Sequence, residues 1–297
     1  MQATSIRQRG AGIGGRRAAC LALVLLSVAC AGCVENNAGR EPRISPDTAR
    51  RELFLRGHDY NEKEFLSQAA EGDPLAVKLF LAAGMSAEVK DPDGATPLIA
   101  AARKGHAKVV RVLVDAHADL NAQDYEGLTA LMRAIQQDSP ECVRLLLDGG
   151  ADPNVRTRRG STALMIATQR GSQELVELLL DHGAELDALD GNTGTALLWA
   201  VFYDHPDLAR FFLDRGASPN TRNDEGGTPL MIAAVRGDPD TVRLLLERGA
   251  DPSAKDNAGK DALRWAVENR RARVVPILQE ATGAKVTTPT PGGRTGR

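Results

Sequence analysis

The stretch Gly226–Asp256, GGTPLMIAAVRGDPDTVRLLLERGADPSAKD, carries two short helical patterns on either side of a glycine. Thr228 is a typical N-cap residue, and Pro229 stands at the first helical position, where its missing N–H costs nothing. Gly237 is expected to end the first helix, and Pro239 to begin the second. The stretch therefore predicts a helix-turn-helix unit.

The second helix of this unit is amphipathic. Val242, Leu245 and Leu246 follow the spacing i, i+3, i+4 and are predicted to face inward, and Gly249 is predicted to stop the helix. Two helices of this length cannot bury their apolar residues alone. They can do so when they stack on copies of themselves, so the unit predicts a repeat protein.

The same pattern recurs along the chain every 33 residues. The tripeptide T-P-L or T-A-L, with D-A-L at the last step, begins at Thr96, Thr129, Thr162, Thr195, Thr228 and Asp261. A glycine followed by alanine recurs with the same period, after an apolar triplet, at Gly150, Gly183, Gly216 and Gly249. Features that keep one period over several steps identify an internal repeat.

The period, the T-P-L start, the alanine pair and the G-A-D end resemble the ankyrin repeat family. The resemblance covers about residues 59–281, where seven units fit, the first and the last of them degenerate. It implies an all-α ankyrin-repeat solenoid of about seven 33-residue helix-turn-helix units with short loop or hairpin fingers. The family's usual histidine after T-P-L is absent, and more apolar packing is expected because other residues stand there: Ile99, Met132, Met165, Leu198, Met231 and Arg264.

The C-terminal end of the array departs from the repeat. Pro276 is predicted to interrupt the second helix of the last unit and to leave it kinked or short. Gln279 replaces an inward apolar residue of the earlier units, as expected for a unit that turns one face to water. Residues 282–297 have no apolar pattern and are expected to form a disordered tail.

Residues 34–58, ahead of the first unit, read as a polar tether followed by a short N-terminal helix. The helix is expected over Pro46 to Arg56, with Ala49, Leu53 and Leu55 leaning on the first unit.

Residues 1–33 resemble a secretory signal peptide. A basic start precedes the uninterrupted apolar run Ala18–Ala29. This run is shorter than the roughly 20 residues that a membrane span needs, and it lacks the amphipathic face of an ordinary buried helix. We therefore expect residues 1–33 to contain a signal peptide that is removed on export.

The segment SVACAGC, residues 27–33, resembles the lipobox of bacterial lipoproteins. The resemblance implies acylation of Cys33, which follows an Ala-Gly pair; Cys30 is the alternative, because Leu26 is better placed before it. Cleavage after Ala31 without lipidation stays open, since an A-x-A pattern ends there. Neither cysteine is followed by Asp, which by resemblance implies export to the periplasm and attachment to the outer membrane.

Composition and motifs point away from catalysis. The net charge of −2 gives no basis for nucleic-acid binding, and no phosphate-binding loop is present. The histidines lack metal spacing, so neither a metal nor a cofactor is predicted. Three of the four cysteines fall in residues 1–33, and Cys142 is expected to pack as a small hydrophobic residue. An enzyme would need its catalytic residues outside the repeats, where little chain remains.

Positions that differ from unit to unit are free of the packing that the repeat requires. They lie two to four residues before each N-cap, on the finger tips, and seven and eight residues after it, at the end of the first helix. By resemblance to ankyrin domains, they line one concave face that binds a protein partner. The predicted contact residues are Tyr125, Glu126, Arg158, Arg159, Arg170, Asn192, Phe202, Tyr203, Asp224, Glu225 and Arg236.

The aromatic members of this set carry most weight. Phe, Tyr and Trp make up only 4% of the chain, yet Tyr125, Phe202 and Tyr203 fall on positions predicted to be exposed. Tyr and Arg are common anchors of interfaces, and three arginines of the set lie between these aromatics. Trp199 and Trp265 share one position in the middle of a first helix and are expected to pack rather than to contact a partner.

We therefore expect a monomeric, non-catalytic protein-binding module of the bacterial cell envelope, held to the membrane only by an N-terminal lipid. By resemblance to exported bacterial ankyrin proteins, it either neutralises a partner, as an immunity protein does for a toxin, or supports stress defence in the envelope. An effector delivered to a host cell is an alternative, which the lipobox argues against.

Overall fold

The computed structural model describes residues 44–283, and these form a single unit by their contacts. The predicted signal peptide, Cys30 and Cys33, most of the tether and the tail from residue 284 lie outside the described residues. Residues 44–283 contain fifteen helices and no strand. None of these helices is long and apolar enough to span a membrane.

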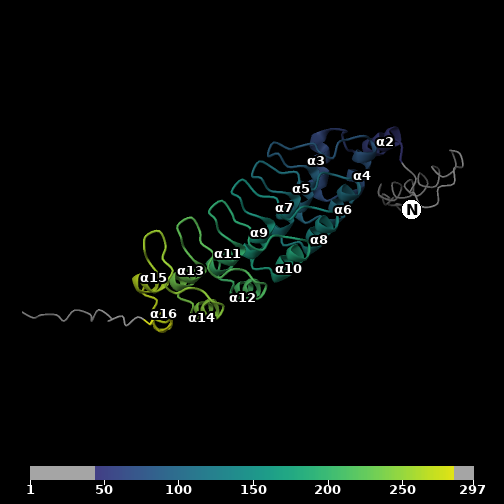
Figure 1. Cartoon of the computed structure of the whole chain (residues 1–297). Coiled ribbons are helices and arrows are strands. Elements are labelled where there is room, and N and C mark those ends of the chain that lie inside the picture. The colour runs from purple at the N-terminus through teal and green to yellow at the C-terminus, as the bar shows by residue number, and fades with distance from the viewer. Residues whose placement is uncertain (1–43, 284–297) are drawn as a thin grey trace, which may run out of the picture. The chain divides into compact units, whose positions relative to one another are not determined.

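Seven helix pairs follow one another, and the first helices of the pairs form one row while the second helices form another (Figure 1). The all-α solenoid of about seven helix-turn-helix units is therefore confirmed. The pairs are α3 (Glu62–Glu71) with α4 (Pro74–Ala82), α5 (Pro97–Lys104) with α6 (Ala107–Asp115), α7 (Ala130–Gln136) with α8 (Pro140–Asp148), α9 (Ala163–Arg170) with α10 (Gln173–Asp181), α11 (Ala196–Phe202) with α12 (Pro206–Asp214), α13 (Pro229–Arg236) with α14 (Pro239–Glu247), and α15 (Ala262–Glu268) with α16 (Val275–Thr282).

The first helix of each unit begins where the sequence places its cap. The side chain of Thr228 accepts a hydrogen bond from the Met231 N–H, and the Asp261 carboxylate does the same for Arg264. Thr162 differs, because its buried hydroxyl has no hydrogen-bond partner. The repeated threonine is thus a structural cap, almost fully buried in each of the five units that have it.

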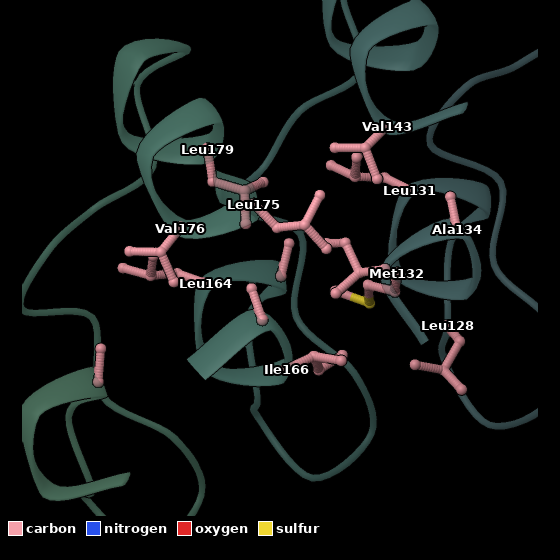
Figure 2. Packing of buried hydrophobic residues seen from close by; sticks show 14 of the residues in the cluster. Leu128, Leu131, Met132, Ala134, Val143, Leu164, Ile166, Leu175, Val176 and Leu179 are labelled. Carbon is pink, nitrogen blue, oxygen red and sulfur yellow. The ribbon is translucent and has the colours of Figure 1, made fainter. Parts of the chain in front are cut away.

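Packing between units is apolar and close. Ala101, Ala134 and the alanines at the equivalent position of later units are buried, so neighbouring first helices can approach one another. Figure 2 shows the apolar side chains of α7 to α10 gathered between the two rows, with Met132 and Leu164 among them. Met132 stands where the family has its histidine, and its full burial confirms the more apolar packing expected there.

The buried stripe of α14 differs from the prediction. Val242 and Leu245 are fully buried as expected, but Leu246 is half-buried, and Leu244 is buried in its place. Pro239 and Thr241 in the first turn are buried as well. Helices α12 and α16 pack against α14 from both sides. The buried face of α14 is therefore wider than the predicted i, i+3, i+4 stripe, and its centre lies closer to Thr241.

The last helix, α16, is shorter than the other second helices, as predicted, but Pro276 does not interrupt it. The repeat places its start near residue 272, but the helix begins at Val275 and contains Pro276 in its first turn. Proline needs no N–H partner at that position, so it delays the helix instead of interrupting it.

Helix α2 (Pro46–Arg56) packs beside α4 ahead of the first unit. Its Ala49 and Leu53 are fully buried, and the Arg50 guanidinium donates to the Ala83 carbonyl at 3.2 Å. Leu55 does not lean on the unit as expected, because it lies on the other side of the helix and is 66% exposed.

Candidate protein-binding face

The loops that precede the first helices of the units, from α5 to α15, project on one side of the stack as a row of fingers (Figure 1). We call these fingers, together with the C-terminal ends of α5, α7, α9, α11, α13 and α15, the finger face. Each finger is closed by the residue five positions before the N-cap. In one finger, the Asp190 carboxylate accepts from the N–H groups of Asn192 and Gly194, both at 2.8 Å. Side chains in the same position hold the other fingers: Asp91, Asp124, Thr157, Asn223 and Asp256.

Neighbouring finger tips are joined by backbone hydrogen bonds. The Tyr125 N–H donates to the Asp93 carbonyl at 3.0 Å, and the Asn257 N–H donates to the Glu225 carbonyl at 2.9 Å. The steps between them are closed in the same way, by Arg158 to Glu126, Gly191 to Arg159 and Asp224 to Asn192. The tips therefore form a fixed row, and their side chains hold defined positions along the stack.

Tyr125 is ordered on this row although it is 58% exposed. Its ring lies against Gly94 of the preceding finger, where an added Cβ would come within 2.7 Å of a ring carbon. One face of the ring is thus packed on the protein, and the rest is open to a partner.

Phe202 and Tyr203 form an aromatic pair at the end of α11. Their ring centroids lie 5.1 Å apart in an edge-to-face arrangement, and Tyr203 also packs on Trp199 at 5.6 Å. The Gln169 amide donates to the Tyr203 hydroxyl at 3.1 Å. Phe202 remains 57% exposed and Tyr203 36%, so both rings are positioned by neighbours and still reach the surface.

Several charged residues of the predicted set are held by internal partners. Glu126 pairs with Arg133 at 2.6 Å, and Arg133 also pairs with the buried Asp124 at 2.6 Å. Burial acts to lower the pKa of Arg133, but its hydrogen bonds to the two carboxylates outweigh this and raise the pKa.

Two further members of the set are engaged in the same way. Arg236 donates to the Phe202 carbonyl at 2.7 Å and pairs with Asp204 at 2.9 Å, and the Asp224 carboxylate accepts from the Thr193 hydroxyl at 2.8 Å. These residues stabilise the face, whatever they contribute to a partner.

Other members of the set have side chains without such partners. Within residues 44–283, the exposed side chains of Arg158, Arg159, Arg170 and Glu225 form no hydrogen bond or ion pair. The exposed Asn192 contributes backbone bonds to the finger row and also leaves its side chain open. The unpaired arginines therefore supply positive charge that a partner can reach on this face.

The sequence reading missed a set of polar contacts between finger and helix. The indole N–H groups of Trp199 and Trp265 donate to Asp190 and Asp256, each at 2.8 Å, in the same way as Arg133 bonds Asp124. Where the fingers have Thr157 or Asn223 in place of this aspartate, the helix position is an isoleucine. A donor nine residues after an aspartate, in every second unit, is the signal that could have revealed these contacts.

A hollow of about 570 Å³ opens on the finger face near its C-terminal end. Its apolar lining comes from the ends of α11 and α13 and from α15, through Phe202, Ile232, Val235 and Trp265. Trp265 thus borders open surface in addition to packing, which the sequence reading did not expect. The polar lining includes Asn223, Glu225, Arg236, Asp256 and Arg271.

The histidines and the cysteine, which are common catalytic or metal-binding residues, have structural roles here. His106 and His205 each direct Nε2 to a carbonyl of the preceding unit, Ala70 and Gln169, at 3.0 and 3.1 Å. Burial raises the pKa of the Cys142 thiol, which disfavours the reactive thiolate. In the described part of the chain, no His, Cys, Asp and Glu side chains gather as a metal site.

The comparisons with known proteins agree with this architecture. The family model for ankyrin repeats in three copies matches residues 66–157, 149–223 and 215–290, and the chain belongs to the ankyrin-repeat family. No curated protein sequence matches the chain.

Two solved structures are similar over most of the chain. The human ASB11 ankyrin repeat domain has 27% identity and a TM-score of 0.65, covering 75% of this chain and 99% of that one. The ankyrin repeat domain of Bcl-3, described as a unique member of the IkappaB protein family, has 34% identity and a TM-score of 0.66, covering 72% and 97%. Ankyrin repeats are generally protein–protein interaction modules, and such domains are typically non-catalytic.

Proposed function

We propose that this protein is a non-catalytic binding module of the bacterial cell envelope that captures one protein partner on its finger face. The observation that carries the proposal is the group of exposed but ordered aromatic rings, Tyr125, Phe202 and Tyr203, beside arginines that have no internal partner. Rings held in place before binding lose little conformational entropy when a partner covers them.

The envelope location in this proposal rests on residues 1–33. The basic start, the short apolar run and the small residues before Cys33 support export with a lipid on that cysteine, or on Cys30. If so, palmitate label enters the parent protein and is lost from the Cys33→Ala or the Cys30→Ala variant. Absence of label in the parent, or equal label in the double variant, contradicts the lipid anchor.

Two roles fit such a module: inhibition of a partner, as an immunity protein inhibits a toxin, and support of envelope stress defence. Tagged full-length protein, extracted from the envelope in mild detergent, is expected to co-purify with one dominant protein whose identity distinguishes these roles. A secreted hydrolase encoded beside this protein favours inhibition. Recovery of the protein from culture medium or from a host cell contradicts the envelope location.

The same experiment tests the face. Tyr125→Ala and Tyr203→Ala are expected to reduce the co-purified protein, because each removes a ring from the predicted interface. Arg111→Ala and Arg210→Ala serve as controls, because these exposed arginines lie on the second helices α6 and α12. Loss of the partner in the controls and not in the ring variants contradicts the proposed face.

A further inference from the structure

The hollow near the end of the finger face has an apolar lining whose neighbouring cations are already engaged. Phe202, Val235 and Trp265 supply much of the apolar surface. Arg236 is held by Asp204 and the Phe202 carbonyl, and Arg271 donates to the Val235 carbonyl at 2.7 Å. An apolar side chain can therefore enter without stripping these guanidinium groups of their partners.

Free positive charge lies to one side of the hollow. Arg170 follows Gln169, which is bonded to Tyr203 of the next unit, so this guanidinium belongs to the unit beside the aromatic pair. Arg158 and Arg159 stand on the finger of the same unit, and all three side chains are unpaired within residues 44–283. The lining of the hollow itself contains an unpaired carboxylate, Glu225. Acidic groups of a partner are thus attracted beside the hollow and not into it.

The spacing sets the size of the occupant. Packed helices lie roughly 10 Å apart, so one to two units separate the arginines from the hollow by about 10–20 Å. An extended chain rises about 3.3 Å per residue, so about three to six residues span this distance.

From these features, and resting on the proposed function, we propose that the partner presents an extended peptide segment with two parts. Acidic side chains lie on Arg158, Arg159 and Arg170, and an aromatic or branched aliphatic side chain, about three to six residues away, fills the hollow. A continuous polyanion such as single-stranded nucleic acid fits less well, because the positive charge is not continuous along the row. Glu126 stands on the finger before Arg158 and Arg159, and Asp224 and Glu225 stand on the second finger after them.

Synthetic peptides test this chemistry with the full-length protein. The lead peptide carries two glutamates and one phenylalanine separated by four Gly or Ser residues, made in both chain orders and labelled for fluorescence anisotropy. Matched peptides replace the glutamates by lysine or the phenylalanine by serine, and a single-stranded oligonucleotide of similar length is the polyanion probe.

The lead peptide, in one of its orders, is expected to bind at least about tenfold more tightly than any matched probe at low salt. Arg158→Ala with Arg170→Ala is expected to remove its preference for Glu over Lys, and Phe202→Ala its preference for Phe over Ser. Phe54→Ala is the matched control, because Phe54 is an exposed aromatic residue on α2, outside the finger face. Each variant is checked by thermal melting, so that a folding defect is separated from a binding defect.

Equal or tighter binding of the lysine peptide or the oligonucleotide, or no measurable binding of the lead peptide, overturns the inference. If the co-purified partner then still depends on Tyr125 and Tyr203, the proposed function stands and only the peptide chemistry is wrong. If partner binding is also indifferent to these rings, the proposed face fails as well.

Discussion

From the second unit on, the residue nine positions after the N-cap, just beyond the first helix, alternates in type along the chain. Gly105, Gly171 and Gly237 have positive φ there, as do Asp138, Asp204 and Arg270 in the units between them. A left-handed backbone costs an L-residue about 1–2 kcal/mol, and short polar side chains tolerate it better than arginine does. Arg270, with φ 57°, is therefore a strained position near the end of the stack.

Replacing Arg270 by glycine is expected to stabilise the protein. The relief of left-handed strain exceeds the added entropy of the unfolded chain, for a net gain of about 0.5–1 kcal/mol in the free energy of unfolding. Urea denaturation measures it. The mirror change, Gly237→Ala, is expected to destabilise, since φ is +80° and the new Cβ would lie 2.6 Å from the Arg271 Cδ. A less stable Arg270→Gly variant contradicts this reading.

Asp256 links finger structure to pH. Its carboxylate accepts from the Lys260 N–H and from the Trp265 indole, and these bonds lower its pKa below the ordinary 3.8. A carboxyl group whose pKa is lowered in the folded state contributes stability above its unfolded pKa, and this is lost as pH falls through the folded pKa.

Asp256→Asn is therefore expected to make stability less dependent on pH below about 4. The amide oxygen can still close the finger, as Asn223 does in the preceding unit, but the ionisable group is gone. Melting temperatures of parent and variant between pH 2 and pH 6 measure the effect. Parallel curves would show that Asp256 does not contribute to the acid sensitivity.

At the scale of elements, the sequence predicted helix starts correctly where the same capping residues recur in each unit. Thr228 and Pro229 define a helix start through local chemistry, so the start is readable from the sequence. The late start of α16 and the outward Leu55 of α2 were not, because they depend on what the neighbouring unit covers. The bonds of Trp199 and Trp265 to the fingers were missed because both partners look ordinary when each is read alone.

Helix α14 offers a matched test of packing between units. Leu245→Ala is expected to cost about 2–5 kcal/mol, because it opens a cavity where the side chain is fully buried. Leu246→Ala is expected to cost clearly less, since Leu246 is half-buried. Denaturant titration of the two variants compares them directly. Equal losses of unfolding free energy would contradict the burial pattern and would support the sequence prediction that Leu246 faces inward.

At the scale of the whole molecule, the stack separates framework from surface. Buried positions must repeat because every unit meets the same neighbours, and the residues that vary remain on the finger face. Comparing positions between units therefore predicted correctly that the proposed contact residues are exposed, but it could not predict the hollow. The hollow is lined by residues of the last three units, and no single unit contains it.

The most direct test of the central claim compares binding and stability in the same variants. Once the partner has been identified, its affinity is measured by calorimetry for the parent, Phe202→Ala, Arg158→Ala and the control Arg210→Ala, each also followed by thermal melting. Phe202→Ala is expected to weaken binding about thirtyfold, equivalent to about 2 kcal/mol, while stability changes by less than about 0.5 kcal/mol. Arg158→Ala is expected to weaken binding in a salt-dependent way, and Arg210→Ala to leave it unchanged. Normal binding by both finger-face variants, with loss of binding in Arg210→Ala, would contradict the account.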